Sequence, residues 1–181
     1  MPNNIAGWFP DSNQKTLAKL IKDHDIKTVI EIGSFVGLST VFFAERCEHV
    51  IAIEPFNALQ NCDYLNDEMK KIAENQRAEY DKNTAGFKNI DTIASTSKQA
   101  NRLPYFPDAD LIYIDGSHKY EDVLEDIQIW LPKAKIVICG DDYSPWWPGV
   151  RQAVDEKLPE ANKDDRLWYF IKKNDWDKKI S

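Results

Sequence analysis

Short apolar, β-branched runs alternate with helical patterns along almost the whole chain, and this alternation limits the folds that it can adopt. The runs predict strands over Thr28–Ile32, Val50–Ile53, Asn89–Ala94, Leu111–Ile114, Lys135–Cys139 and Leu167–Ile171. Residues 57–86 are predicted to hold one or two helices, and helical spacing is also found over Asn13–His24, Gly37–Cys47, Tyr120–Leu131 and Val150–Leu158. Such alternation is typical of parallel strands joined by helical crossovers. We therefore expect an α/β fold, a doubly wound and mostly parallel Rossmann-like sheet, in a single domain over residues 1–181.

The composition supports a folded domain and argues against several partners. The chain has 181 residues, of which 43% are hydrophobic, so it can bury a core of its own. Its net charge is −7 and no Lys/Arg cluster occurs, so we expect no nucleic-acid partner. The apolar runs are too short to cross a bilayer, and the N-terminus lacks a signal-peptide pattern, so no membrane partner is expected. An odd number of cysteines without metal-ligand spacing predicts reduced thiols in a cytoplasmic protein: Cys47, Cys62 and Cys139.

Two features after the first two predicted strands are typical of a nucleotide-like ligand. Gly33 and Gly37 stand in a G-x-x-x-G spacing between the first strand and the next helix, where backbone amides can approach a ligand. Glu54 ends the second strand, about 20 residues further on, where an acid can bind both hydroxyls of a ribose. The alternatives are a tight turn without a ligand and a surface glutamate.

The stretch VICGDDYSPWW contains two adjacent carboxylates, which repel each other unless a positive charge or water lies between them. Asp141 and Asp142 end the fifth predicted strand, and Asp115 ends the fourth. If these strands are neighbours, the three carboxylates lie at one sheet edge, where a hard divalent cation, magnesium or calcium, would remove the repulsion. The alternative is that both acidic segments are ordinary turns.

Four segments, in this order, resemble the class I S-adenosylmethionine-dependent methyltransferases: EIGSFVGLST, IAIEP, LIYIDGSHKYEDV and GDDY. The resemblance covers roughly residues 5–157 and is closest to the small branch of metal-dependent O-methyltransferases that includes the macrolide-sugar enzymes.

The resemblance implies a set of site residues. The methionine end of S-adenosylmethionine would lie against Glu31, Gly33, Ser34, Gly37 and Ser39. The ribose would bind Glu54, and the adenine would lie beside Pro55, Phe56, Ser97 and Lys98. Asp115 would contact the cofactor and would also hold a divalent metal, expected to be Mg²⁺, together with Asp141 and Asp142.

The sequence departs from the family pattern at two places. Ser117 stands where many members have an acid that serves as a base, so His118 and Asp115 are the remaining candidates for a catalytic role. His118 can equally be a helix N-terminal residue that faces water. Of the usual C-terminal strand pair only RLWYFIKK is recognisable, so we expect an abbreviated end of the sheet. A homo-oligomer that covers this edge with a second copy is left open.

The predicted function is methyl transfer from S-adenosylmethionine to a hydroxyl of a small molecule, either a sugar or a phenol-like acceptor. One alternative is a non-catalytic domain that binds S-adenosylmethionine or a nucleotide. Another is an NAD-dependent oxidoreductase, which is disfavoured because Phe35 occupies the middle glycine position of the dinucleotide fingerprint. Tyr143, Trp146 and Trp147 follow the acidic pair and either line an acceptor pocket or pack the loop onto the fold.

Overall fold

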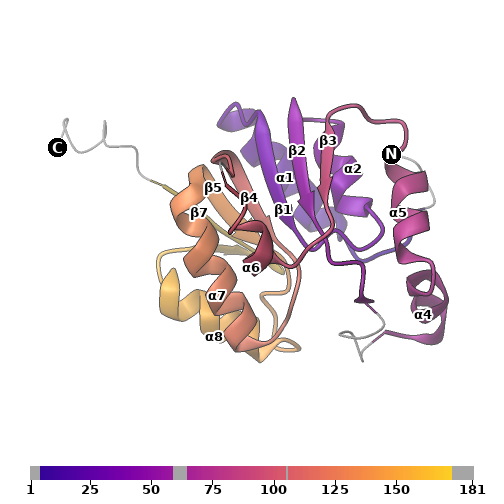
Figure 1. Ribbon diagram of the computed structural model, residues 1–181. Helices are drawn as coiled ribbons and strands as arrows, with labels where there is room; N and C mark the ends of the chain where they lie inside the picture. Colours follow the sequence, from indigo (N-terminus) through magenta and orange to yellow (C-terminus); the bar gives the residue numbers. More distant parts are fainter. Residues whose placement is uncertain (1–4, 59–64, 105, 173–181) are drawn as a thin grey trace.

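A computed structural model describes residues 5–58, 65–104 and 106–172 of the chain. Within these residues a seven-stranded sheet runs in the order β3-β2-β1-β4-β5-β7-β6 (Figure 1). The strands are β1 (Thr28–Ile32), β2 (His49–Ile53), β3 (Ile90–Ile93), β4 (Ala109–Ile114), β5 (Ala134–Gly140), β6 (Asn162–Asp164) and β7 (Leu167–Ile171). Strands β1 to β5 are parallel, whereas β7 is antiparallel to both of its neighbours. The predicted fold class is confirmed.

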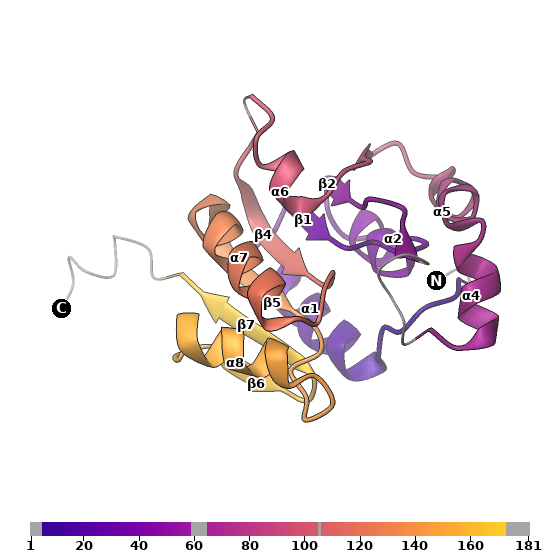
Figure 2. The ribbon, with the colours of Figure 1, turned by 60° about the horizontal axis from the view of Figure 1, so that its bottom comes forward.

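Helices cover both faces of this sheet, and Figure 2 shows α8 beside β6 and β7 at one end and α4 and α5 at the other. The helices are α1 (Asp11–Asp23), α2 (Leu38–Ala44), α4 (Asp67–Ala73), α5 (Gln76–Thr84), α6 (Ser97–Ala100), α7 (Tyr120–Trp130) and α8 (Pro148–Lys157). A short 3₁₀ turn, Leu131–Lys133, leads from α7 into β5. Among the described residues, no helix combines the length and the apolar character that a membrane crossing requires. Cys62 lies outside the described residues, while Cys47 and Cys139 are buried thiols.

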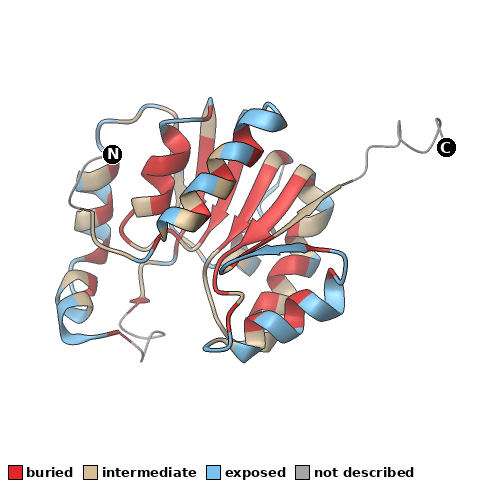
Figure 3. Cartoon of the chain, turned by 180° about the vertical axis from the view of Figure 1, so that it is seen from behind, coloured by how far each residue is buried: buried red, intermediate tan, exposed pale blue. Residues whose placement is uncertain are grey.

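Alternate residues of the central strands pack into two separate cores, one on each face of the sheet. Ile30 and Ile32 of β1 belong to the core under α7 and α8, together with Trp130. Val29, from the same strand, belongs to the core under α1 and α2. The central strands are therefore buried on both faces, as Figure 3 shows. The same alternation turns Glu31 toward α2, which determines its partners in the site.

The C-terminal strand pair is complete, although the sequence indicates only one of its strands. β6 has three residues, and all of them are exposed, so it carries no apolar pattern that would predict a strand. It pairs with β7 through a tight turn at Asp165, which adopts the left-handed conformation (φ 54°) that aspartate tolerates better than most residues. The abbreviated sheet end is thus a short hairpin, and this hairpin carries Arg166 to the edge of the site.

Gly140, at the end of β5, allows the close packing that places the two following aspartates. A Cβ atom at this position would lie 2.4 Å from the carbonyl oxygen of Ile114 and 2.7 Å from the ring of Trp168. We expect Gly140→Ala to lower the free energy of unfolding by about 1–3 kcal/mol, because neither the strand backbone nor a buried tryptophan can move away freely. Urea denaturation measures this change.

Gly86→Ala is the matched control, since a Cβ atom there would meet nothing within 4 Å. Its free energy of unfolding should equal that of the unmodified protein or exceed it slightly. Equal stability of the two variants would contradict the packing argument for Gly140.

Candidate active site at the carboxyl ends of the strands

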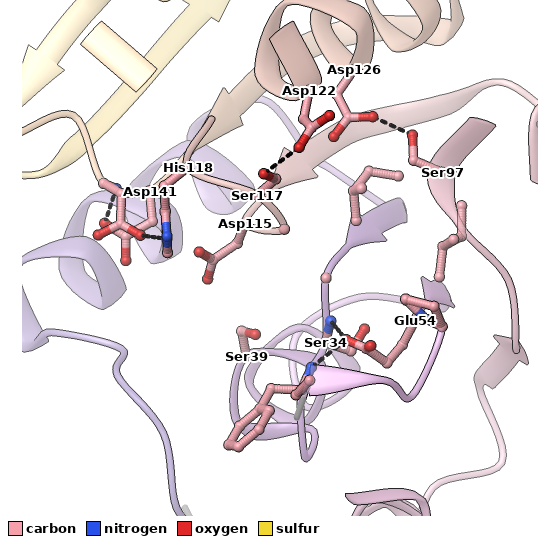
Figure 4. Close-up of a pocket in the computed structure, with 18 of the residues that line it drawn as sticks. Ser34, Ser39, Glu54, Ser97, Asp115, Ser117, His118, Asp122, Asp126 and Asp141 are labelled. Carbon is pink, nitrogen blue, oxygen red and sulfur yellow. Dashed lines mark hydrogen bonds and ion pairs between the residues drawn. The ribbon is translucent and has the colours of Figure 1, made fainter. Parts of the chain in front are cut away.

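One large cavity of about 740 Å³ opens at the carboxyl ends of the parallel strands. It is lined by the loops that follow β1, β2, β4 and β5, by the first turn of α7 and by residues near the N-terminus such as Trp8. This is the place where ligands bind in open parallel sheets. Figure 4 shows the polar side chains that surround it.

The loop after β1 is shaped by its two glycines. Gly33 has φ +85°, and a Cβ atom there would lie 2.3 Å from the carbonyl oxygen of Asp115. The ends of β1 and β4 therefore touch through their backbones, which only a glycine permits. Gly37 has φ +93° and precedes α2, where it packs against Tyr80 and Thr84. Both predicted glycines have the conformational role expected of them.

Glu31 is fully buried beneath this loop and accepts three hydroxyl hydrogen bonds. Ser39 donates to Oε1 at 2.5 Å, while Ser34 and Thr40 donate to Oε2 at 2.9 and 2.5 Å. Burial raises the pKa of Glu31 to about 7, and the three hydroxyls counteract part of that rise. The structure thus brings three of the predicted cofactor residues, Glu31, Ser34 and Ser39, into one hydrogen-bonded group.

Glu54 lies at the end of β2, as predicted, but its carboxylate is held by backbone amides. Oε2 accepts from the N–H groups of Ser34 (3.0 Å) and Phe35 (2.8 Å), and Oε1 accepts from that of Phe56 (2.9 Å). Burial raises the pKa of Glu54, and these amides counteract that rise. Glu54 therefore ties the loop after β1 to the loop after β2 and still lines the cavity.

The four residues predicted near the adenine are placed differently from one another. Pro55 lines the cavity, whereas the ring of Phe56 packs edge-to-face on Tyr80 (5.3 Å between centroids) and is not part of the cavity wall among the described residues. Ser97 and Lys98 both line it. Ser97 donates to Asp126 and accepts from the indole N–H of Trp130 at 2.8 Å, and Lys98 pairs with Glu125 at 2.6 Å.

The three predicted metal ligands do not form a metal site in this arrangement. Asp115, Asp141 and Asp142 all line the cavity, but no group of three His, Cys, Asp or Glu side chains that could hold a metal occurs in the described part of the chain. Both oxygens of Asp142 are already engaged: Oδ1 accepts from the guanidinium of Arg166, and Oδ2 lies 2.5 Å from Nε2 of His118. These residues, as they stand, do not fit a divalent cation.

Asp115 differs from Asp141 and Asp142 because few donors among the described residues reach its carboxylate. The hydroxyl of Tyr113 donates to its Oδ2 at 3.3 Å, and its carboxylate points into the cavity (Figure 4). Burial, with the nearby charges of Asp141 and Glu31, raises the pKa of Asp115 well above its usual range. A carboxylate that burial and neighbouring negative charges make more basic, and that faces a cavity, is suited to accept a proton from a bound hydroxyl.

His118 is oriented on two sides. Its ring stacks on Trp147 at 3.8 Å between centroids, and its Nε2 faces Asp142. Burial lowers the pKa of His118 to about 4, so the imidazole is neutral at pH 7. Ser117 donates to Asp122 at 2.7 Å, so that a carboxylate lies beside this position and lines the cavity.

Sequence reasoning missed three polar residues of the site. Arg166 comes from the β6–β7 turn and Asp122 from the first turn of α7. Burial raises the pKa of Asp141, and Asn13 of α1, itself fully buried, counteracts part of that rise, although neither of its polar side-chain atoms makes a hydrogen bond of normal geometry within the described residues. Of these three residues, only Asp122 had a local signal in the sequence, which was its spacing from Ser117. Of the aromatic residues after the acidic pair, Trp147 lines the cavity, while Trp146 is 84% exposed.

The sheet order with its antiparallel β7, and the cavity at the strand ends, define the class I methyltransferase fold. A comparison with protein families matches residues 30–143, more than half of the chain, to the family described as "Methyltransferase domain", and the chain belongs to this family. No curated protein matches the sequence. Family membership favours the predicted methyltransferase over the oxidoreductase alternative.

Solved structures of methyltransferases share the fold. A protein from Staphylococcus aureus, provisionally named a caffeoyl-CoA O-methyltransferase, is 20% identical, with a TM-score of 0.65 over 92% of this chain and 86% of its own. An O-methyltransferase from Bacillus cereus in complex with SAH is 18% identical, with a TM-score of 0.58 over 93% and 84%. A TDP-rhamnose 3'-O-methyltransferase of calicheamicin biosynthesis is 13% identical, with a TM-score of 0.57 over 89% and 78%.

The pKa of Glu31 predicts a defined dependence of stability on pH. The unfolded chain loses this proton near pH 4.5 and the folded protein near pH 7, so the unfolded state binds fewer protons between these values. The contribution of Glu31 to the free energy of unfolding should therefore be present below pH 4.5 and be lost as the pH rises to about 7. Glu31→Gln, which does not titrate, should remove this part of the decline.

Denaturant titrations of both proteins across this pH range measure the difference. The exposed Glu74, at the end of α4, provides the control Glu74→Gln, which should follow the unmodified protein. A difference between Glu31→Gln and the unmodified protein that stays constant with pH would contradict the assignment.

Proposed function

We propose that this chain is an S-adenosylmethionine-dependent O-methyltransferase that acts on a hydroxyl of a small molecule, either a sugar or a phenol-like acceptor. The observation that carries the proposal is the cavity in which the glycine loop after β1, Glu54 after β2 and Asp115 after β4 meet. Its volume of about 740 Å³ has room for a nucleoside cofactor with a small acceptor.

The cofactor would bind on the side of the cavity formed by β1 and β2. Ser34 and Ser39 line the cavity and offer hydroxyl groups to the amino-acid end of the cofactor, and Glu31, buried beneath them, accepts a hydrogen bond from each. Glu54 offers carboxylate oxygens to the ribose hydroxyls. Because these oxygens now accept backbone amides, ribose binding would add to those hydrogen bonds or replace them.

Transfer is a displacement at the methyl carbon. The acceptor oxygen forms a bond to this carbon, the carbon–sulfur bond breaks with its electron pair going to sulfur, and the acceptor proton moves to a base. We assign the base to Asp115, whose carboxylate faces the cavity and, among the described residues, accepts from the hydroxyl of Tyr113 alone. His118, whose Nε2 faces Asp142, orients the wall of the acceptor pocket together with Trp147. No step of this proposal passes through a metal ion.

Cofactor binding is the first test. We expect S-adenosylmethionine and S-adenosylhomocysteine to raise the thermal unfolding temperature and NAD⁺ to leave it unchanged. Glu54→Gln should weaken S-adenosylmethionine binding in calorimetry by about 10-fold or more, the usual cost of losing a hydrogen bond to a charged group. Glu74→Gln again serves as the control, and a shift with NAD⁺ alone would rule out the proposed function.

The charge of the cavity wall predicts which acceptors are used. In the part of the chain that the structure describes, three cationic side chains line the cavity, Lys98, Lys119 and Arg166, and carboxylates pair with Lys98 and Arg166. They face a larger group of acidic residues: Glu54, Asp115, Asp122, Glu125, Asp126, Asp141 and Asp142. A polyanionic acceptor would be repelled by this wall.

We therefore expect kcat/KM to be at least about 10-fold higher for a neutral sugar or catechol than for the same group linked to a nucleoside diphosphate or coenzyme A, because like charges repel. The difference should shrink as salt is added. Formation of S-adenosylhomocysteine with matched acceptor pairs measures it. Preference for the phosphate-bearing member of each pair would show that the acceptor does not contact this wall.

A further inference from the structure

We propose that the guanidinium of Arg166 is the cation of the acceptor site, so that methyl transfer in this protein needs no divalent metal. The catalytic part of this proposal rests on the proposed function, whereas the part about metal binding does not. Its claim that Arg166 excludes a metal ion from the acidic pair can be tested without turnover.

The position of Arg166 is fixed by contacts on both sides of the hairpin turn. Its carbonyl oxygen accepts the backbone N–H of Tyr143 at 2.9 Å, which ties the turn to the loop after β5. From the other side, Ser12 of α1 donates to Asp165 at 2.7 Å, and Thr16 donates to Asp164. The fold therefore positions Arg166 beside Asp141 and Asp142, and their contact is not an incidental surface ion pair.

The guanidinium supplies the charge that the two carboxylates require. It pairs with Oδ1 of Asp142, and its Nε lies 3.7 Å from Oδ1 of Asp141. Asp141 and Asp142 have side chains only 2% and 9% exposed, so their repulsion is weakly screened by water. A planar guanidinium, which keeps its charge across the working pH range, compensates both carboxylates at once.

A metal ion would have to displace this arrangement. Asp142 has no free oxygen, because Arg166 holds Oδ1 and His118 faces Oδ2. A divalent cation at the pair would also lie within a few ångströms of the guanidinium charge and be repelled by it. Arg166 itself lines the cavity, so its N–H groups can donate to an acceptor oxygen and favour the deprotonated form of a hydroxyl.

The first experiment measures cation binding in the absence of substrate. Mg²⁺ and Mn²⁺ are titrated into the full-length protein, Arg166→Met and Lys163→Met, with calorimetry and thermal unfolding as readouts. Lys163 is the matched control, because it is a cation of the same hairpin with a side chain 29% exposed, against 33% for Arg166, and it pairs with Asp155.

We expect neither ion to bind to the unmodified protein or to Lys163→Met, and both to bind to Arg166→Met with a rise in unfolding temperature. Adding Asp142→Asn to Arg166→Met should abolish the new binding. Saturable binding to the unmodified protein would overturn the proposal, and so would an Arg166→Met variant that binds no cation.

The second experiment measures turnover with and without a chelator. Activity of the unmodified protein and of Lys163→Met should be unchanged by the chelator. Arg166→Met should lose at least about 10-fold in kcat, because it lacks a charged donor, with a smaller change in KM. Arg166→Lys should recover part of the loss. Loss of activity on chelation, or full kcat in Arg166→Met, would overturn the proposal, whereas absent cofactor binding would count against the proposed function alone.

Discussion

Burying several carboxylates along one edge of a sheet is the constraint on which the rest of this site depends. The parallel register places Glu31, Glu54, Asp115 and Asp141 at or next to the ends of adjacent strands. Each of these groups has a pKa raised by burial, so each is costly to keep charged without donors around it. The surrounding loops supply those donors.

The donors differ in kind from one carboxylate to the next, and this difference separates their roles. Glu31 receives hydroxyls and Glu54 receives backbone amides, so both stabilise the loops of the cofactor side. Asp142 receives a guanidinium and a histidine. Asp115 receives one phenolic hydroxyl at 3.3 Å, which leaves it the carboxylate with the greatest demand for a further partner among these groups. A carboxylate in this state is better suited to take a proton from a bound acceptor than one that is already fully hydrogen-bonded.

Much of the fold could be predicted from the sequence, because the central strands carry unbroken apolar runs and the helices between them have clear periodicity. The position of Glu54 was also predictable, since it depends only on where β2 ends. β6 was not, because Asn162–Asp164 contains no apolar residue to indicate a strand. The role of Arg166 could not be predicted either, because this residue follows β6 and its partners Asp141 and Asp142 are more than 20 positions earlier in the chain.

The strand ends predict the positions of Asp115, Asp141 and Asp142, but they do not predict the partners of these side chains. Parallel topology correctly places Asp115, Asp141 and Asp142 at the same edge, but it does not specify the directions of their side chains. Asp142 has φ 64°, a left-handed conformation that turns it away from the course of β5, and its two oxygens meet Arg166 and His118. Asp141 instead lies beside Asn13 and the Nε of Arg166. Spacing predicted a shared need for positive charge, whereas only the packing of the C-terminal hairpin specifies that an arginine meets it.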